Sequence, residues 1–317
     1  MLNNKIAIVL VTFNRLDKLK IALECYENQS YPLREMIVVD NCSTDGTDKF
    51  LNRWRDQKGK FERKVLTLTE NTGGAGGFGA GMDYLLDEVK NGKSSADWIM
   101  VSDDDAFPTP DAIDKLISYY GGLCEKEQKK IAVLSSKVLN HGTPHLAHRS
   151  RVKRNALRVQ FVGVSESEYS KDAFELDLFS YVGSMIKIVA LQQVGTTRRD
   201  LFIYGDDNEH SLRLKTYGKL ICVPASVYNH DTPGVETRKV GWHNYYNRRN
   251  QLFILKKYFP KRYLVVRIAK RYILDISVIS KYNREEKKLF KIAQDDAMAE
   301  RLGRHPIYKP GFQIRGG

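Results

Sequence analysis

The sequence predicts an α/β protein with a mostly parallel sheet flanked by helices, followed by a basic, mainly helical C-terminal region. Two observations indicate the sheet. Short apolar runs alternate with segments of helical periodicity. After Ser102, the apolar run 98–101 is also followed by three consecutive aspartates, a pattern typical of a buried strand with charged residues at its C-terminal end. A third observation separates the two regions, because the excess of positive charge lies near the C-terminus.

The composition is that of a globular protein of one large domain or slightly more. The chain has 317 residues, of which 42% are hydrophobic and 10% aromatic, so it can bury a large core. No apolar run approaches the roughly 18 residues that a membrane-spanning helix needs. The four cysteines are scattered without metal-ligand spacing, which favours reduced thiols in the cytosol.

The charge distribution divides the chain. Residues 238–291 hold 16 Lys and Arg against 3 Asp and Glu, an excess equal to the formal net charge of +13 of the whole chain. Residues 1–237 hold 31 basic and 32 acidic side chains. We therefore expect a near-neutral domain over 1–237 and a basic helical region over 238–317. The cations lie on one amphipathic segment, and the sequence has no RNA- or DNA-binding motif, which argues against a nucleic-acid binder.

Strands are predicted at the apolar runs of the first domain. The runs are 6–12, 36–40, 65–68 and 98–101, with a later one at 220–223. Helical spacing follows the first run, at Leu16, Leu19, Leu23 and Tyr26. Ligands of parallel sheets bind beyond the C-terminal strand ends, so the residues that follow the runs should converge on one crevice. These residues are Thr12, Asn14, Arg15, Asp40, Asn71, Gly73, Gly74, Asp103, Asp104 and Asp105.

The three aspartates at 103–105 indicate a divalent cation. Adjacent like charges repel, so positive charge should lie among them. Oxygen ligands suit Mg²⁺ or Mn²⁺, which bind through carboxylates together with a substrate's phosphates. The first strand lacks the G-x-G-x-x-G turn of a dinucleotide fold, and the chain has no Walker A loop. Two alternatives are a solvated acidic turn and an aspartate that caps a helix starting near Pro110.

Five segments together resemble one enzyme family. They are 12–15 (Thr-Phe-Asn-Arg), 39–46 (Val-Asp-Asn-Cys-Ser-Thr-Asp-Gly), 71–78 (Asn-Thr-Gly-Gly-Ala-Gly-Gly-Phe), 103–105 (Asp-Asp-Asp) and 201–209 (Leu-Phe-Ile-Tyr-Gly-Asp-Asp-Asn-Glu). The sequence resembles the family-two nucleotide-sugar glycosyltransferases with the GT-A fold, and most of all the bacterial galactofuranosyl- and rhamnosyl-type enzymes of surface-polysaccharide assembly. The resemblance covers roughly residues 5–255. It implies a nucleotide-sugar half over about 1–110 and an acceptor half over about 111–237.

The resemblance also implies roles for single residues. Asp103 and Asp105 would bind Mn²⁺ or Mg²⁺, with His230 as a further ligand, although one histidine is more often structural. Asp40 would bind the uracil or ribose. The residues that would line the rest of the nucleotide and donor site are Thr12, Asn14, Arg15, Asn71, Gly73, Gly74, Asp103 and Asp104.

Asp207 matches the family's catalytic carboxylate, which removes the acceptor hydroxyl proton as the alcohol attacks the anomeric carbon. Asp206 and Glu209 would support it or face the acceptor. The alternative is that 206–207 caps a helix and that Glu209 faces water. Gly183, Trp242 and Arg249 are further candidates at the acceptor site, and packing of a C-terminal helix on the body is the competing interpretation of 242–250.

The resemblance implies an inverting, metal-dependent hexosyltransferase that moves galactofuranose from UDP-galactofuranose onto a lipid-linked glycan. The paired tryptophans frequent in galactofuranosyl relatives are missing at 181–184. A rhamnosyltransferase using dTDP-rhamnose is therefore one alternative. A nucleotidyltransferase is another, although the segment 12–15 does not resemble its phosphate loop.

An amphipathic helix is predicted beyond Pro260. Its apolar stripe could lie on an anionic membrane surface or pack on the body. The first interpretation, with the lipid-linked acceptor, implies a peripheral protein at the inner face of the bacterial cytoplasmic membrane; a homodimer is left open. Residues 141–175 are expected to be a mobile solvated insertion, with an acceptor-binding loop as the alternative. The stripe consists of Val265, Ile268, Ala269, Tyr272, Ile276 and Ile279, with Arg267, Lys270, Arg271 and Lys281 opposite.

Overall fold

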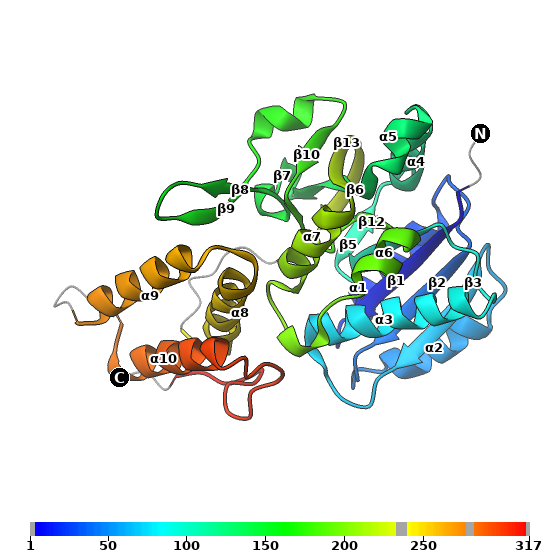
Figure 1. The fold of residues 1–317 in the computed structure, drawn as a ribbon. Helices are drawn as coiled ribbons and strands as arrows, with labels where there is room; N and C mark the ends of the chain where they lie inside the picture. The colour runs from blue at the N-terminus through cyan, green and yellow to red at the C-terminus, as the bar shows by residue number, and fades with distance from the viewer. Residues whose placement is uncertain (1–3, 233–239, 277–281, 315–317) are drawn as a thin grey trace.

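The computed structural model describes residues 4–232, 240–276 and 282–314 (Figure 1). Its centre is a ten-stranded mixed sheet with the main order β10-β13-β6-β12-β4-β1-β2-β3. Helices cover both faces of this sheet, and three C-terminal helices form a separate layer beside it (Figure 1). The predicted α/β architecture with a helical C-terminal region is therefore confirmed.

The first half of the sheet is parallel, as the alternating pattern predicted. Strands β1 and β2 pair so that Thr12 lies opposite Asp40, and β1 and β4 pair so that Val11 lies opposite Asp103. The strand ends named in the sequence therefore meet at one edge. The strands are β1 (Ile6–Thr12), β2 (Glu35–Asp40), β3 (Glu62–Thr67) and β4 (Trp98–Asp103). The crossover helices are α1 (Leu16–Glu27), α2 (Thr47–Asp56) and α3 (Gly73–Lys90).

Two apolar layers hold the helices to the sheet. Alternate side chains of β1 point to opposite faces, so Ile8 packs in the cluster that includes α1 and α2, whereas Val9 packs with α3. Two glycines of α3, Gly77 and Gly81, lie close to the sheet, and a Cβ at Gly77 would come within 2.6 Å of Val11. Glycine is therefore required there by helix–sheet packing.

The second half of the sheet is mixed. Strand β12 is antiparallel to both β4 and β6, and β13 is parallel to β6. A short strand, β5, pairs with the end of β13 and sets His230 opposite Ala106. These strands are β5 (Ala106–Pro108), β6 (Ile131–Asn140), β10 (Phe174–Leu176), β12 (Ser184–Lys187) and β13 (Lys219–His230). The helices are α4 (Ala112–Gly121), α5 (Glu125–Lys129), α6 (Ile188–Val194) and α7 (Asp206–Tyr217).

Residues 141–175 are not a solvated insertion, and that expectation was wrong. They form strands and short 3₁₀ turns, and β8 pairs with both β9 and β11 in a second sheet. Val152, Val159 and Phe161 pack against the C-terminal helices. The elements are β7 (Thr143–Pro144), β8 (Arg149–Arg154), β9 (Val159–Gly163) and β11 (Leu178–Phe179).

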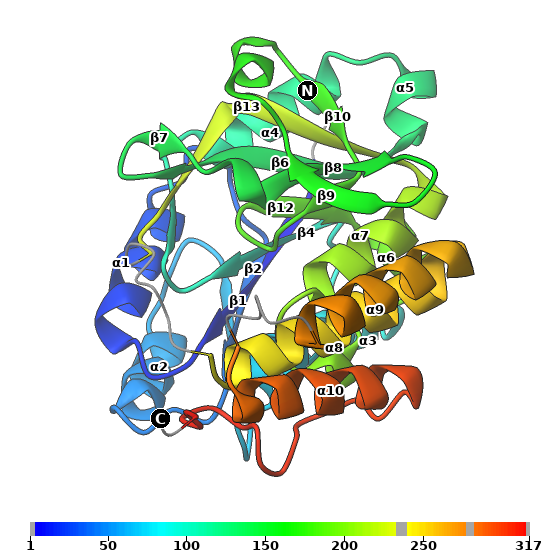
Figure 2. The ribbon, with the colours of Figure 1, turned by 90° about the vertical axis from the view of Figure 1, so that its left-hand side faces the viewer.

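The C-terminal region contains α8 (Trp242–Tyr258), α9 (Lys261–Ile276) and α10 (Arg284–Met298). They lie side by side in both views (Figures 1 and 2). The expected domain boundary at 237–238 lies outside the described residues. So do Ile279, predicted on the apolar stripe, and Lys281, predicted on the opposite face. Within the described part of the chain, no helix combines the length and the apolar character needed to cross a bilayer.

Candidate active site

The aspartates at the end of β4 are buried and lie beside cationic and hydroxyl groups. Asp104 and Asp105 are 3% and 4% exposed, which contradicts a solvated acidic turn, and Asp111 rather than the triplet precedes α4. Arg15 donates from Nη1 to Asp104 Oδ1 at 3.0 Å and to Asp105 Oδ2 at 2.6 Å. Thr12 donates to Asp104 Oδ2 at 2.8 Å. The expected positive charge among the carboxylates is therefore present in Arg15.

Two carboxylates and one imidazole form a candidate metal site. Ligand atoms of Asp103, Asp105 and His230 all lie within 4.8 Å of one another. His230 Nε2 is 3.3 Å from Asp105 Oδ1. The pairing of β5 with β13 produces this arrangement, because it returns the end of β13 to the chain that directly follows the aspartates.

The pKa shifts of these carboxyl groups indicate that Arg15 compensates their negative charge only in part. Burial, followed by the charges of Asp105 and Asp104, raises the pKa of Asp103 to about 7. Burial also raises the pKa of Asp105, but the hydrogen bond from His230 and the charge of Arg15 outweigh it, so the net pKa is lowered. A divalent cation fits this donor set, since oxygen and imidazole ligands suit Mn²⁺ and the charge would stabilise both carboxylates.

Two further histidines extend from His230. His148 Nε2 lies 3.2 Å from His230 Nδ1 and 3.1 Å from His145 Nδ1. His148 Nδ1 lies 2.6 Å from Ser180 Oγ. The three imidazoles also satisfy the spacing of a metal-binding group. Sequence reasoning missed this cluster, although the H-x-x-H spacing of 145 and 148 was a readable signal.

The loops after β1 and β2 are joined around Asp40. Asp40 is fully buried, and its Oδ1 accepts a hydrogen bond from the Ser43 amide at 2.9 Å. Asn14 Oδ1 accepts from the Thr44 amide at 2.7 Å, which connects the two loops. No described residue donates to Asp40 Oδ2, although this oxygen is buried. A buried acceptor without a donor fits an N–H or O–H group of a ligand such as uracil or ribose.

The glycine-rich segment begins with a turn that depends on Asn41. Asn41 Oδ1 accepts from the Thr72 amide at 2.9 Å, and its Nδ2 donates to the Gly73 carbonyl at 3.0 Å. Asn71 Oδ1 accepts from the Gly73 amide at 2.8 Å. Gly73 has φ +73°, whereas at Gly74 a Cβ would have no neighbouring atom within 4 Å. The sequence prediction gave binding roles to Asn71, Gly73 and Gly74, whereas Asn41, which lies in the matching segment 39–46 and holds the turn, was given no role.

We expect Gly73→Ala to destabilise the protein by about 2–4 kcal/mol. A Cβ at Gly73 would lie 2.0 Å from the Phe202 carbonyl oxygen, a backbone atom, and φ is in the left-handed region. The matched control is Gly74→Ala, because a Cβ at Gly74 has no neighbour within 4 Å. Urea denaturation measures both variants. Equal unfolding free energies for the two variants would contradict the geometry.

A pair of carboxyl groups stands at the N-terminus of α7. Burial, followed by the charges of Asp207 and Asp103, raises the pKa of Asp206 well above its usual range. Asp206 and Asp103 are therefore close enough to interact electrostatically. Burial raises the pKa of Asp207 to about 6, against hydrogen bonds from backbone amides and the charge of Arg149. Burial and their mutual charge thus disfavour ionisation of both carboxyl groups at the same time.

Arg149 is a buried cation within residues 141–175, the segment expected from the sequence to be a solvated insertion. It is 0% exposed and donates to the carbonyl oxygens of Ser136 at 2.8 Å and Val182 at 2.7 Å. It also donates to the His148 carbonyl at 2.8 Å. The guanidinium thus holds β8 to β6 and to the segment before β12.

The structure does not place Glu209 or Arg249 at the acceptor site, and these two predictions are corrected. Glu209 is fully buried, pairs with Arg213 at 2.8 Å and accepts a hydrogen bond from Tyr258 of α8. Arg249 is 1% exposed and donates to the carbonyls of Leu201 and Gly303. Both residues hold α8 against the body, which is the packing interpretation of 242–250.

The two remaining candidates lie in different surroundings. Gly183 has φ +61°, and a Cβ there would lie 2.7 Å from the Tyr228 ring, so its role is steric. Trp242 begins α8 and stacks on His243 with ring centroids 3.6 Å apart. Asn250 of the same helix donates to the carbonyls of Leu201, Ile203 and Tyr204. Helix α8 therefore fixes the segment that leads into Asp206.

Comparison with known proteins identifies the family. Residues 7–177 match the family Glycosyl transferase family 2, which is more than half of the chain. The chain belongs to glycosyltransferase family 2. A stretch of 70 residues of this family-2 enzyme is 33% identical to TuaG of Bacillus subtilis (strain 168), named as a teichuronic acid biosynthesis glycosyltransferase. That stretch covers 22% of the chain and 27% of TuaG.

Solved structures share the fold of this family-2 enzyme. S. aureus TarS 1–349 has a TM-score of 0.56 at 15% identity, over 94% of this chain and 82% of TarS. GalNAc-T7 with UDP, GalNAc and Mn²⁺ has a TM-score of 0.61 at 14% identity, over 94% and 56%. The mannosyltransferase PcManGT from Pyrobaculum calidifontis, in complex with GDP-Man and Mn²⁺, has a TM-score of 0.54 at 18% identity, over 93% and 75%. The fold is therefore GT-A-like.

Proposed function

We propose that this family-2 enzyme is an inverting, metal-dependent transferase that moves a hexose from a UDP-sugar to a glycan hydroxyl. The observation that carries the proposal is the convergence of Asp103, Asp105 and His230 within 4.8 Å, with Asp206 electrostatically coupled to Asp103. The candidate metal ligands and Asp206, the residue directly before the candidate base Asp207, thus belong to one site. UDP-galactofuranose is the proposed donor, from the sequence segments at 71–78, and dTDP-rhamnose is the alternative.

The cation would be held by Asp103, Asp105 and His230, and Mn²⁺ suits the imidazole ligand better than Mg²⁺ does. When bound, it supplies positive charge that stabilises the diphosphate leaving group. His148 would accept a hydrogen bond from His230 Nδ1 across 3.2 Å, which would orient Nε2 toward the carboxylates. Arg15 adds a permanent positive charge beside Asp105.

Asp207 would remove the proton of the acceptor hydroxyl. At the same time the hydroxyl oxygen bonds to the anomeric carbon, and the bond from that carbon to the diphosphate breaks. One displacement inverts the anomeric centre. With a pKa of about 6, Asp207 is ionised at neutral pH and still basic enough to accept the proton. Asp206 stands beside it, and its raised pKa lessens the repulsive charge next to the base.

The acceptor is proposed to be a lipid-linked glycan of cell-surface polysaccharide synthesis. TuaG, similar over 70 residues, is named for a polysaccharide pathway, which supports this choice. A lipid-linked acceptor would place the enzyme peripherally at the cytoplasmic face of the bacterial membrane. Family membership favours sugar transfer over nucleotidyl transfer.

UDP should raise the melting temperature by about 5 °C when it is present at about 100 times its dissociation constant with Mn²⁺, and much less without the metal. The reason is that Asp40 can bind the nucleoside alone, whereas the diphosphate needs the charge of the cation. A thermal-shift titration with UDP, dTDP and GDP, each with Mn²⁺ or EDTA, measures this effect. A shift that is equal with Mn²⁺ and EDTA would contradict a metal-bridged diphosphate, and a preference for dTDP would favour the rhamnosyl alternative.

A further inference from the structure

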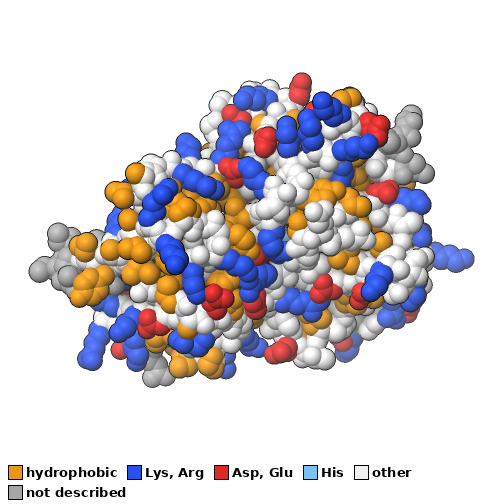
Figure 3. Space-filling view, in the orientation of Figure 1, with side chains coloured by type: hydrophobic (Ala, Val, Ile, Leu, Met, Phe, Trp, Pro, Cys, Tyr) orange, Lys and Arg blue, Asp and Glu red, His pale blue; other side chains and the backbone are white. Residues whose placement is uncertain are grey.

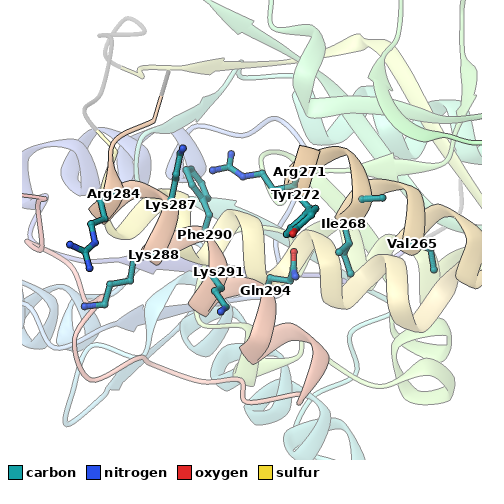
Figure 4. Close-up of a pocket in the computed structure, with 11 residues that line it drawn as sticks. Val265, Ile268, Arg271, Tyr272, Arg284, Lys287, Lys288, Phe290, Lys291 and Gln294 are labelled. Carbon is teal, nitrogen blue, oxygen red and sulfur yellow. The ribbon is translucent and has the colours of Figure 1, made fainter. Parts of the chain in front are cut away.

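A groove of about 810 Å³ lies between α9 and α10, at the end of the molecule away from α5 (Figures 1 and 4). Its floor is apolar and is formed mainly by α9. Val265 is 62% exposed and Tyr272 is 66% exposed, whereas Ile268 is partly buried against the core. The apolar stripe predicted from the sequence is thus divided, with part of it packed and part of it open to the groove.

The rim of the groove is cationic. Five Lys and Arg side chains surround the floor, and none of the described residues that line it is acidic. The Arg271 guanidinium lies 4.2 Å from the centre of the Phe290 ring, so cation and apolar surface are in direct contact. In the space-filling view, hydrophobic side chains gather over the C-terminal helices with Lys and Arg beside them (Figure 3). The cationic lining residues are Arg271, Arg284, Lys287, Lys288 and Lys291.

We propose that this groove binds a phosphate-bearing membrane lipid, with the phosphate among the cations of α10 and the hydrocarbon chain along Val265, Ile268 and Tyr272. An anionic amphiphile matches both features of the groove. Each cation near an anionic surface contributes about 1 kcal/mol, and the apolar floor gains from removal from water. The inference deepens the proposed function, because it names how the enzyme would reach a lipid-linked acceptor.

Other occupants match only one of the two features. A second copy of the chain related by a two-fold axis would bring the same cationic rims together, which repel. A free phosphate or a nucleic acid backbone would pair with the cations and leave Val265 and Tyr272 in water. These occupants are therefore separate outcomes of the test.

The test measures binding of the full-length protein to phosphatidylglycerol–phosphatidylcholine vesicles by flotation, with pure phosphatidylcholine vesicles as reference. We expect the wild type to prefer the anionic vesicles. Lys288→Gln with Lys291→Gln should weaken that binding about 30-fold, since two contributions of about 1 kcal/mol are lost. The matched control is Lys126→Gln with Lys129→Gln on α5, which removes the same charge from the opposite end and should leave binding unchanged.

A second pair of variants tests the apolar floor. Val265→Ser with Tyr272→Ser should weaken binding to anionic vesicles about tenfold or more, and should abolish the part of the binding that resists high salt. Both side chains are exposed, so the fold is not expected to suffer. Val189→Ser on α6, where the side chain is 54% exposed, is the matched control. Unchanged binding of the floor variant would show that the protein adsorbs to vesicles by charge alone. It would overturn the proposal that the groove binds lipid.

Four further results would overturn the inference. They are equal binding to both kinds of vesicle, an unchanged rim variant, stabilisation by inorganic phosphate without vesicle binding, and a dimer in ultracentrifugation that the floor variant abolishes. The Mn²⁺-dependent shift with UDP should persist in every variant. If vesicle binding fails while that shift remains, only the lipid site is wrong; if the shift fails while vesicle binding remains, only the proposed sugar transfer is wrong.

Discussion

Replacing Asp207 by Asn should leave UDP binding intact and reduce sugar transfer by about 10²- to 10⁴-fold. The amide keeps the size of the side chain but cannot accept the proton of the acceptor hydroxyl. Donor binding should survive, because the residues around the nucleotide and the candidate cation lie on other elements, at the ends of β1, β2, β4 and β13 and at the start of α3. Steady-state kinetics and UDP titration measure the two properties separately.

The same carboxyl group sets a pH dependence with a defined sign. Asp207 acts only when ionised, so the rate should rise with pH through about 6 and then level off. For stability the sign is opposite. The raised pKa means that the folded protein holds this proton more tightly than the unfolded chain, so stability decreases as pH rises toward about 6. At pH 8, Asp207→Asn should therefore melt above the wild type.

The matched control is Asp172→Asn, which changes an exposed aspartate in the bend before β10 and should leave rate and melting temperature unchanged. An Asp207→Asn enzyme that transfers sugar at the wild-type rate would remove Asp207 from the catalytic role. The buried neighbour Asp206 would then be the next base to test.

Arg149→Met should lower the free energy of unfolding by about 3–5 kcal/mol. Methionine fills much of the same volume but removes the side-chain donor from the buried carbonyls of Ser136 and Val182, whereas the His148 carbonyl keeps the hydrogen bond from the Ser180 amide. Each unsatisfied buried acceptor costs about 1–3 kcal/mol, only partly recovered from the buried cation's own desolvation. Chemical denaturation followed by circular dichroism measures the loss.

Arg151→Met is the matched control two residues along the same strand. Arg151 is 41% exposed and pairs with Glu168 at 2.7 Å on the surface, so its loss should cost less than about 1 kcal/mol. Equal losses of unfolding free energy for the two variants would show that the hydrogen bonds of Arg149 do not hold β8 to the main sheet.

The edge of the sheet that carries the site could be predicted from the sequence. In a parallel sheet, every strand that enters from the same side ends at the same edge, so the residues after the apolar runs meet whatever the connecting loops do. Thr12, Asp40 and Asp103 are adjacent for this reason, and the register of β1 with β2 and β4 confirms it. The residue types at these ends then indicate the chemistry.

The contacts of the buried charged residues near that edge could not be predicted, because they form between elements that are distant in sequence. Arg149 stands in a run of cations that reads as a solvated surface, and only the pairing of β8 with β11 and the bonds to β6 bury it. Glu209 has the sequence neighbourhood of a catalytic carboxylate, yet Tyr258 lies against it from a helix 49 residues away. The local periodicity of the sequence predicts neither the burial of Arg149 nor the tertiary hydrogen bond to Glu209.

The central claim is that Asp103, Asp105 and His230 bind the divalent cation that the UDP-sugar needs. Titration of Mn²⁺ by electron paramagnetic resonance, with UDP present, tests it without requiring sugar transfer. Wild type and the Asp172→Asn control should bind Mn²⁺ equally, and Asp105→Asn should bind it at least about 100-fold more weakly, because one of two carboxylate ligands is lost. Equal Mn²⁺ affinity in all three proteins would contradict the account.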